Sequence, residues 1–557
     1  MKNIITLSVL LLILLVSTSA INAQPFSADL VVTNANIRTM DSKRTIARSL
    51  AVHNGKIVAI GSDADTKPLV GAKTRIIDAG GKTIIPGFND AHVHFMETGY
   101  QLASVDLRDA KTPEEFVARI KAFAAKLPKG RWIMGGQWDH ENWTPNNLPT
   151  AALIDAATPD NPVFINRLDG HMALANSLAM KLAGIAKDVK DVAGGEIVRD
   201  AGGNPTGIFK DAAASYIERA IPAASFEQKL EAAQAATDHA ASLGVTSVQD
   251  MSPNGTEIGV YQELLKRGTL KTRVYNCSPL GDFKRWSNTG ARWAFGDPML
   301  RIGCLKGYAD GSLGSTTAWF FDPYLDAPNS RGLAMPDVTT TMRQDIENAD
   351  KAGLQVRIHA IGDRANATIL DHYQAVEKAN GLSNRRFTIE HAQHMRLDDL
   401  KRFASQKVVA SMQPFHAIDD GRWAWKRLDP PRLKGTYAFR TILDSGGVLA
   451  FGSDSPVAPL DPIFGVYAAV TRRTLDDKNP NGWIPEQKIS VDETVRAFTW
   501  GSAYAEFQEG RKGTLEIGML ADFVVLSEDI FTIDPTKING VRVLSTVVDG
   551  KVVFERK

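Results

Sequence analysis

Two histidines separated by one residue give this sequence its sharpest chemical signal. His92 and His94 close the stretch Pro86-Gly-Phe-Asn-Asp-Ala-His-Val-His, which reads as the end of a β-strand. Alternate residues of a strand point to the same face, so both imidazoles can reach one metal ion. Histidine is a common ligand of metals in proteins. Two exposed histidines on one strand face would give the same pattern, so the pair needs support from elsewhere in the chain.

Three further ligand-type residues each close an apolar run later in the chain. His359 ends Val-Arg-Ile-His, His391 ends Thr-Ile-Glu-His and Asp454 ends Ala-Phe-Gly-Ser-Asp. In a (β/α)₈ barrel the carboxyl ends of the strands meet on one face, where active sites lie. Each residue alone could be a hydrogen-bonded core histidine or a helix-capping aspartate. Their joint placement at strand ends predicts a single metal centre.

Lys306 ends the apolar run Arg-Ile-Gly-Cys-Leu-Lys, where a buried ammonium group would be costly. One interpretation is that its side chain reaches solvent or pairs with Asp310. The other is that its neutral amine adds CO₂ to form a carbamate, whose two oxygens can bridge two metal ions. Two nearby cations would stabilise that anion. We therefore count Lys306 among the candidate ligands and leave its modification open.

The elements that position these residues repeat along the middle of the chain. Short β-branched runs alternate with helical stretches, which is typical of βα units. The predicted strands end near His94, Asp250, Ser278, Lys306, His359, His391, Gln413 and Asp454. Eight such units favour a closed parallel barrel. The first two strand ends are about 150 residues apart, far more than a βα connection needs. We predict an α/β fold: a (β/α)₈ TIM-like barrel over 88–509, with a large insertion after its first strand, at about 99–235, over the active face.

Both ends of the chain carry further β-rich segments. Residues 28–33, 50–60 and 74–78 precede the barrel, and residues 521–526 and 541–554 follow it. Asn54-Gly55 and Asp549-Gly550 are hairpin turn signals between apolar runs. These segments predict one small β-sandwich assembled from 24–87 and 510–557.

The first 23 residues resemble a secretory signal peptide. Lys2 precedes an apolar run over 4–16, and small residues lead to Ala23. The run is shorter than the roughly 20 residues that span a bilayer, which disfavours an uncleaved anchor. We expect cleavage after Ala23 or Ala20, no stable membrane insertion afterwards, and a periplasmic or secreted protein.

Charge and cysteine content narrow the remaining classes. The 64 Lys and Arg residues balance 63 Asp and Glu residues, which gives no electrostatic case for nucleic acid as a partner. An oxidising compartment would permit a disulfide between Cys277 and Cys304. Both lie in apolar strand-like runs, however, so we expect buried free thiols.

The order and strand positions of the candidate ligands resemble the amidohydrolase superfamily. Five motifs are similar to its subgroup that contains N-substituted formamide deformylases (amidohydrolase family 3): 306–315, 359–365, 412–416, 452–456 and 520–526. The resemblance covers the chain after the signal. It implies one or two divalent metal ions, with zinc the expected ion. By the resemblance, the first ion is held by His92, His94 and Asp454, and a carboxylated Lys306 bridges to a second ion held by His359 and His391.

The resemblance also implies roles in catalysis. Asp454 would accept a proton from the attacking water and deliver it to the leaving amine. His416 is a second catalytic candidate, for stabilising the oxyanion or binding substrate. Deaminase relatives lack the bridging lysine and carry a glutamate soon after the fifth-strand histidine, whereas His359 is followed here by Ala-Ile-Gly-Asp-Arg.

These features predict hydrolysis of a linear amide, formamide or related non-peptide C–N bond in a small molecule. The alternatives are hydrolysis of a cyclic amide or of a lactone or other ester on the same centre, and a catalytically silent binding scaffold. Candidate substrate contacts are His171, Trp138, Asp310 and Arg473, and homo-oligomerisation is left open.

Overall fold

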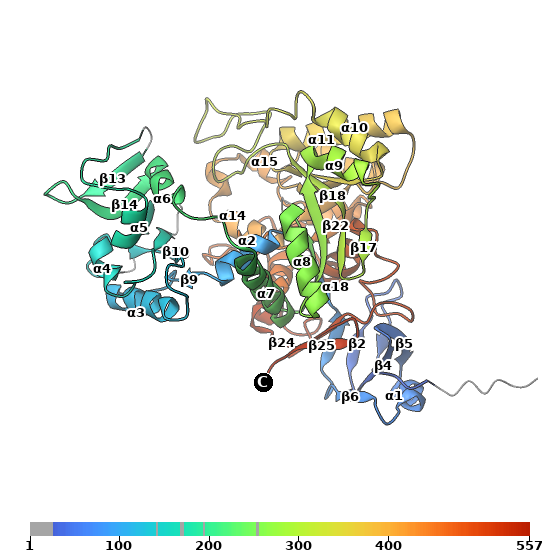
Figure 1. Cartoon of the computed structure of the whole chain (residues 1–557). Coiled ribbons are helices and arrows are strands. Elements are labelled where there is room, and N and C mark those ends of the chain that lie inside the picture. The colour runs from blue at the N-terminus through green and yellow to red at the C-terminus, as the bar shows by residue number, and fades with distance from the viewer. Residues whose placement is uncertain (1–25, 141–142, 168–171, 193–194, 252–254) are drawn as a thin grey trace, which may run out of the picture.

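The computed structural model describes residues 26–140, 143–167, 172–192, 195–251 and 255–557. Its centre is a nearly closed barrel of parallel strands with helices packed outside (Figure 1). Within the described residues, the barrel strands run in the order β8 (Phe88–Val93), β15 (Val245–Asp250), β16 (Arg273–Pro279), β18 (Leu300–Tyr308), β19 (Gln355–Ala360), β20 (Thr388–His391), β21 (Val409–Met412) and β22 (Val448–Phe451). A short strand, β17 (Phe295–Asp297), pairs with β18 in the antiparallel direction. The predicted barrel is confirmed.

The last strand meets the first through loop residues rather than through a regular ladder. The amide of Asp454 donates to the carbonyl of His92 over 2.7 Å, and the amide of His94 donates to the carbonyl of Ser455 over 2.9 Å. A β-carbon on Gly452 would lie 2.5 Å from the backbone nitrogen of His92, so only glycine permits this approach. Closing the barrel therefore places Asp454 beside the His92-Val-His94 pair.

Helices and short helical turns fill the connections between barrel strands. The helices of the barrel are α2 (Phe95–Leu102), α7 (Phe226–Ser242), α8 (Gly255–Arg267), α9 (Phe283–Asn288), α10 (Met342–Lys351), α11 (Asp363–Asn380), α12 (Leu397–Leu400), α13 (Arg402–Ser405), α14 (Pro414–Asp420), α15 (Pro430–Leu433), α16 (Phe439–Asp444), α17 (Pro462–Thr471), α18 (Val491–Arg496) and α19 (Ser502–Ala505). A capping box of Ser225 and Gln228 starts α7.

The insertion after β8 is a separate layer of strands and helices. Its sheet has the order β13 (Gly195–Arg199), β14 (Pro205–Asp211), β12 (Met172–Ala175), β11 (Phe164–Arg167), β10 (Gly135–Trp138) and β9 (Val105–Asp106). Its helices are α3 (Pro113–Ala124), α4 (Ala151–Asp155), α5 (Ser177–Leu182) and α6 (Ser215–Glu218).

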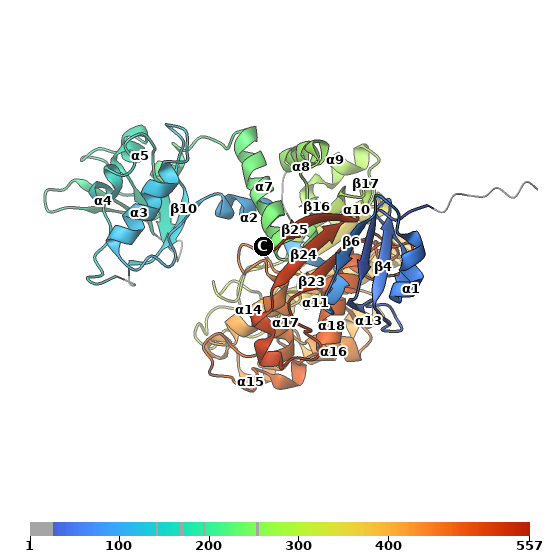
Figure 2. The same cartoon turned by 90° about the horizontal axis from the view of Figure 1, so that it is seen from below.

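The described residues of this insertion lie beside the barrel, whereas the sequence predicted an insertion over the active face. Both views show it set off to one side of the barrel, linked through α2 and α7 (Figures 1 and 2). Its two buried apolar clusters contain insertion residues and no barrel residues. The described part of the insertion therefore buries its apolar side chains in its own core.

The terminal segments form two sheets that pack on a shared core. One sheet has the order β5 (Lys56–Gly61), β4 (Ser49–His53), β1 (Leu30–Thr33) and β6 (Arg75–Asp78). The other has the order β25 (Lys551–Glu555), β24 (Val543–Val548), β23 (Phe523–Leu526), β7 (Thr83–Pro86), β2 (Asn36–Arg38) and β3 (Ile46–Ala47). Strand β7 pairs directly with β23, so the two ends of the chain share one sheet, as predicted. No helix among the described residues is long and apolar enough to cross a membrane, and the proposed signal segment lies outside these residues.

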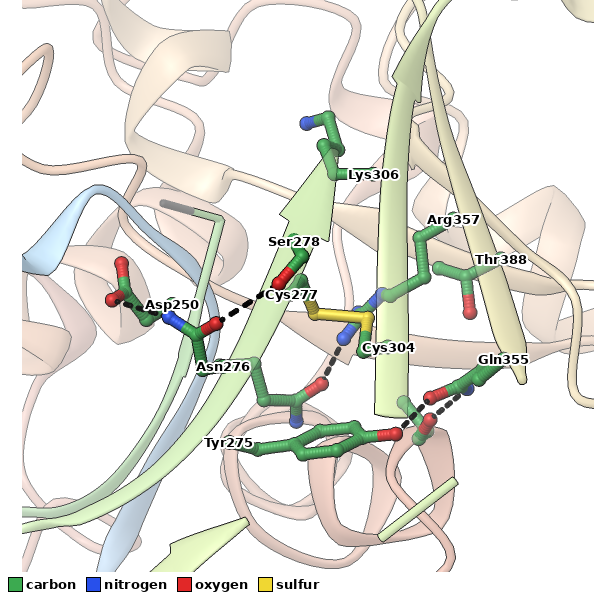
Figure 3. The surroundings of a disulfide bond; sticks show 12 residues. Asp250, Tyr275, Asn276, Cys277, Ser278, Cys304, Lys306, Gln355, Arg357 and Thr388 are labelled. Atoms are coloured by element: carbon green, nitrogen blue, oxygen red, sulfur yellow. Dashed lines mark hydrogen bonds between the residues drawn. A yellow bond between two sulfur atoms is a disulfide. The ribbon is translucent and has the colours of Figure 1, made fainter. Parts of the chain in front are cut away.

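The prediction of free thiols is wrong. Cys277 and Cys304 form a disulfide between the neighbouring barrel strands β16 and β18 (Figure 3). The two residues are partners in the strand register, with Cα atoms 4.3 Å apart. Apolar strand-like runs indicated burial correctly, but the pairing depends on which strands are neighbours and on their register. Cys304 lies in the same strand as Lys306, two residues before it.

Removing this disulfide should destabilise the barrel. Closing a loop across a sequence separation of 27 residues restricts the unfolded chain, which stabilises the folded state by about 3.5 kcal/mol. The Cys277→Ser/Cys304→Ser variant is therefore expected to unfold at a lower denaturant concentration than the wild type. Urea titration with and without a reductant measures the effect. The wild type should be sensitive to reductant once unfolded, and the variant should not; equal midpoints for the two proteins would contradict the prediction.

Candidate metal centre

Three buried ligand-type side chains converge at the carboxyl ends of β8, β20 and β22. The ligand atoms of His92, His391 and Asp454 all lie within 4.8 Å of one another. His94 joins them, with its Nε2 atom 3.4 Å from Asp454 Oδ1, while His92 Nε2 is 3.3 Å from the same oxygen. These four predicted ligands therefore meet at one point, although they come from distant parts of the sequence.

The chemistry of this donor set fits a divalent cation. Asp454 Oδ1 is buried and accepts no hydrogen bond from the described residues, although two imidazole nitrogens lie close to it. Burial, together with the neighbouring His359 and His92, lowers the pKa of His391 well below its usual value, so its ring is neutral. Neutral imidazoles and an ionised carboxylate are the ligands that zinc and similar ions require.

Two of these residues adopt backbone conformations that side chains other than glycine rarely take. The φ angle is 71° at His391 and 61° at Asp454. Such conformations cost of order 1–3 kcal/mol each and gather at functional sites. Both residues belong to the candidate metal centre, so the unusual conformations lie at the site itself.

Lys306 lies beside the histidines and is 3% exposed. Its Nζ atom is 3.4 Å from His92 Nε2 and 4.9 Å from the centroid of the Tyr308 ring. Burial lowers the pKa of Lys306 to about 8, against the opposing effect of the Glu390 and Asp454 carboxylates. Among the described residues, the Lys306 side chain neither reaches solvent nor pairs with Asp310. The first interpretation of this lysine, as a solvent-exposed or Asp310-paired side chain, is therefore excluded.

His359 lies at the other side of His391. The two ring centroids are 4.6 Å apart, and His359 Nε2 is 3.1 Å from the carbonyl oxygen of Gly311. If Nε2 donates to that carbonyl, Nδ1 is the nitrogen that remains for a metal ion. The His359 ring therefore lies at the edge of the cluster, next to His391.

His416 is the outermost histidine of the group. It lies in α14, whose first turn follows β21, and its Nε2 atom is 3.9 Å from Asp454 Oδ2. Burial lowers the pKa of His416, so the ring is neutral near pH 7. The Nε2 atom has no hydrogen-bond partner among the described residues, which leaves it available to a bound molecule.

Two of the candidate substrate contacts are buried side chains that already have hydrogen-bond partners. Asp310 is 1% exposed, and its carboxylate accepts from the amides of Trp319, Ile361 and Gly362, which holds the loop after β18 in place. Its Oδ1 atom also lies 3.4 Å from His359 Nε2, at the edge of the cluster. Trp138 is 0% exposed and packs in the core of the insertion, where its Nε1 donates to the carbonyl of Ile165. A packing or hydrogen-bonding role therefore accounts for both side chains, and the prediction that they contact substrate stays a prediction.

The last two candidate contacts are not placed at the centre. Arg473 follows α17, and its Nη2 atom is 3.3 Å from Asp477. His171 lies outside the described residues. The prediction for each of them stays a prediction.

The sequence did not single out the buried residues that contact the Nδ1 atoms of two ligand histidines. Glu390 precedes His391 and is 0% exposed, and one of its oxygens is 2.5 Å from His92 Nδ1. Burial alone would raise the pKa of Glu390, but Arg357 and His92 hold it at about 2. Gln413 supports a second ligand, because its Oε1 atom is 2.8 Å from His391 Nδ1. The signal was present: a charged residue inside each apolar run, at Arg357 and Glu390, suggests partners inside the barrel.

Comparison with known proteins agrees with this geometry. Residues 75–554 match the amidohydrolase family. The chain is 38% identical over 545 residues to Protein LONG AFTER FAR-RED 3 of Arabidopsis thaliana, covering 95% of this chain and 92% of that protein. It is 26% identical over 542 residues to an N-substituted formamide deformylase of Arthrobacter pascens, covering 95% and 98%.

A solved structure shares the fold over nearly the whole chain. The crystal structure of an uncharacterized metal-dependent hydrolase from Pyrococcus furiosus superposes with a TM-score of 0.76 at 30% identity, and the match covers 90% of this chain and 100% of that one. The family match spans most of the sequence. The cluster of histidines and Asp454 lies at the carboxyl ends of the barrel strands, where active sites of this fold are found. The chain belongs to the amidohydrolase family and is a metal-dependent hydrolase that acts on carbon–nitrogen bonds.

Proposed function

We propose that this protein is exported and hydrolyses a linear amide or formamide-like C–N bond of a small molecule. The observation that carries the proposal is the buried Asp454 carboxylate, which has a free oxygen in a ring of histidines. A carboxylate in that position is held ready for a cation and for proton transfer. A binding scaffold without catalysis would have no need to keep it there at the cost of burial and a strained backbone.

The residues divide into two sets around the centre. His92, His94 and Asp454 would hold one ion, and His359 and His391 would hold a second, with a carboxylated Lys306 between them. Zinc is the ion that this histidine-rich set favours. When bound, a divalent cation lowers the pKa of water toward neutrality and polarises a carbonyl group.

Asp454 and His416 supply the proton handling. Burial opposes ionisation of Asp454, but the surrounding histidines hold its pKa well below the usual value, so the carboxyl group is ionised, which is the state that can accept a proton. The same carboxyl group then returns that proton to the leaving amine, which departs as a neutral molecule. His416 Nε2, if it carries the proton of the ring, donates a hydrogen bond to the oxygen that gains charge in the transition state.

The class of substrate rests on the amide-hydrolysing relative. The Arthrobacter pascens protein, by its name, removes formyl groups from N-substituted formamides. We propose that N-acyl or N-formyl amines are the substrates here. A panel of N-formyl and N-acyl amines, lactones and hydantoin-type rings, assayed with zinc-loaded protein, tests this. Turnover confined to the rings or esters would replace the proposal with its alternative, and no turnover of any class would favour a silent scaffold.

The disulfide supports the proposed export of the protein. Bonds between cysteines persist in oxidising compartments and are rare in the cytosol. N-terminal sequencing of protein recovered from the periplasm or the medium tests the proposed removal of residues 1–23. A mature chain that still begins at Met1 would contradict it.

Reconstitution of the centre should depend on pH through Lys306. Only the neutral amine reacts with CO₂, and a pKa of about 8 makes the neutral fraction rise as pH increases through 8. At fixed dissolved CO₂ and zinc, the initial rate at which the metal-free protein regains activity should rise roughly 20-fold from pH 6.5 to 8.5. The Lys306→Arg variant cannot form the carbamate and should show no such rise. A wild-type rate that is flat over this range would contradict the carbamate.

A further inference from the structure

A buried ion pair lies directly beneath the proposed metal centre. Glu390 Oε1 accepts a hydrogen bond from Arg357 Nε over 2.6 Å, and Glu390 Oε2 lies 2.5 Å from His92 Nδ1. All three side chains are 0% exposed. The chain of contacts runs across the barrel interior from β19 through the neighbouring β20 to β8, which is distant from both in sequence.

This arrangement fixes which nitrogen of His92 carries a proton. A carboxylate that is bonded to a guanidinium group can only accept hydrogen bonds, so the partner atom Nδ1 must donate. The lone pair of the ring then lies on Nε2, the atom that faces Asp454 Oδ1 at 3.3 Å. We propose that Glu390 and Arg357 are positioning residues, which select this tautomer of His92 and aim its Nε2 atom at the metal. This inference rests on the proposed metal centre.

Arg357 holds His92 from a second direction as well. Its Nη2 atom donates to the carbonyl of Ala91 over 3.1 Å, which fixes the backbone immediately before His92. Its Nη1 atom donates to Gln249 Oε1 on β15. One guanidinium group thus anchors both the peptide before the ligand and the carboxylate behind its ring. A lysine at this position would keep the charge but could not make this planar set of contacts.

A buried ion pair can also be purely structural, and the chain offers a matched example. Glu506 is likewise 0% exposed inside the protein, where it pairs with Arg301 and with Lys512 Nζ at 2.8 Å. Its other hydrogen bond comes from Asn89, not from a candidate ligand. The two glutamates therefore differ in one respect that matters here: only Glu390 of this pair contacts a histidine of the centre.

The test compares Glu390→Gln with Glu506→Gln in the full-length mature protein. Both variants remove one buried charge from a pair with arginine. Zinc affinity is measured by competition with a chromophoric chelator, and the visible spectrum of the cobalt-substituted protein reports the ligand geometry. We expect Glu390→Gln to bind zinc 10–100-fold more weakly, with an altered cobalt spectrum. Glu506→Gln should lower the denaturation midpoint while leaving zinc affinity and the spectrum unchanged.

Wild-type zinc affinity in folded Glu390→Gln overturns the inference, and so does an equal loss in both glutamine variants, because that would reflect general destabilisation. If Glu390→Gln does not fold, Arg357→Lys replaces it: weaker zinc binding with a changed spectrum supports the positioning role, and unchanged binding overturns it. Failure of the wild type to bind zinc would overturn the proposed metal centre itself, which distinguishes the two failures.

Discussion

The Asp454→Asn variant is expected to lose roughly 10²–10⁴-fold in kcat, because the substitution removes the group proposed to move the proton. Asparagine has nearly the same shape and keeps an oxygen that can face a cation. The metal content should therefore fall less than kcat does. The measurement is steady-state kinetics on the best substrate of the amide panel, with metal content determined on the same sample. Nearly normal kcat in this variant would show that another group handles the proton.

A nearby aspartate provides the control for this prediction. Asp420 lies in α14, four residues after His416, and its carboxylate accepts from Gln393 and Tyr437. The Asp420→Asn variant also removes the carboxylate of a half-buried side chain close to the site, but it leaves the proposed ligands in place. It should therefore retain most of the activity that Asp454→Asn loses. Equal losses in the two variants would attribute the effect to charge in the region rather than to Asp454.

The Lys306→Ala variant is expected to hold about half the metal of the wild type. Protein purified without chelator and with bicarbonate should contain near two equivalents per chain if a carbamate bridges the ions, and one or fewer without the lysine. Plasma mass spectrometry gives the metal content directly. One equivalent in both proteins would leave a mononuclear hydrolase in which Lys306 is structural. No metal in the wild type would remove the basis of the mechanism.

Lys512 is a matched control for Lys306. It is also 3% exposed, and burial likewise lowers its pKa to about 8, but it pairs with Glu506 rather than with a histidine of the centre. The Lys512→Ala variant should be less stable, since it breaks a buried ion pair. Its metal content should equal that of the wild type. A loss of metal in both lysine variants would indicate that destabilisation, not a missing bridge, empties the centre.

Local patterns were sufficient for the barrel and its proposed ligands. A strand end is marked by the change from an apolar run to polar residues, and that change occurs at His94, His359, His391 and Asp454. Once a parallel barrel is inferred, its geometry brings all strand ends to one face. The residues at those ends therefore meet whatever the details of packing, which is why the cluster of His92, His391 and Asp454 could be predicted without coordinates.

The supporting contacts required the tertiary structure. Whether Glu390 faces His92 or the outer helices depends on the register of β20 against its neighbours, and the pairing of Cys277 with Cys304 depends on the register of β16 against β18. The sequence also could not show that Trp138 and Asp310 are buried and hydrogen-bonded to backbone groups, because those partners come from distant parts of the fold.

The sequence by itself determined which residue types stand at each strand end, because alternation and run length are local properties of the chain. The tertiary structure alone decided which side chains meet across strands, because a shift of one residue in strand register turns a side chain to the opposite face of the sheet. Thus the proposed ligands followed from the sequence. The Glu390–Arg357 support, the disulfide and the position of the insertion beside the barrel followed from strand pairing and from where each part of the chain buries its apolar surface.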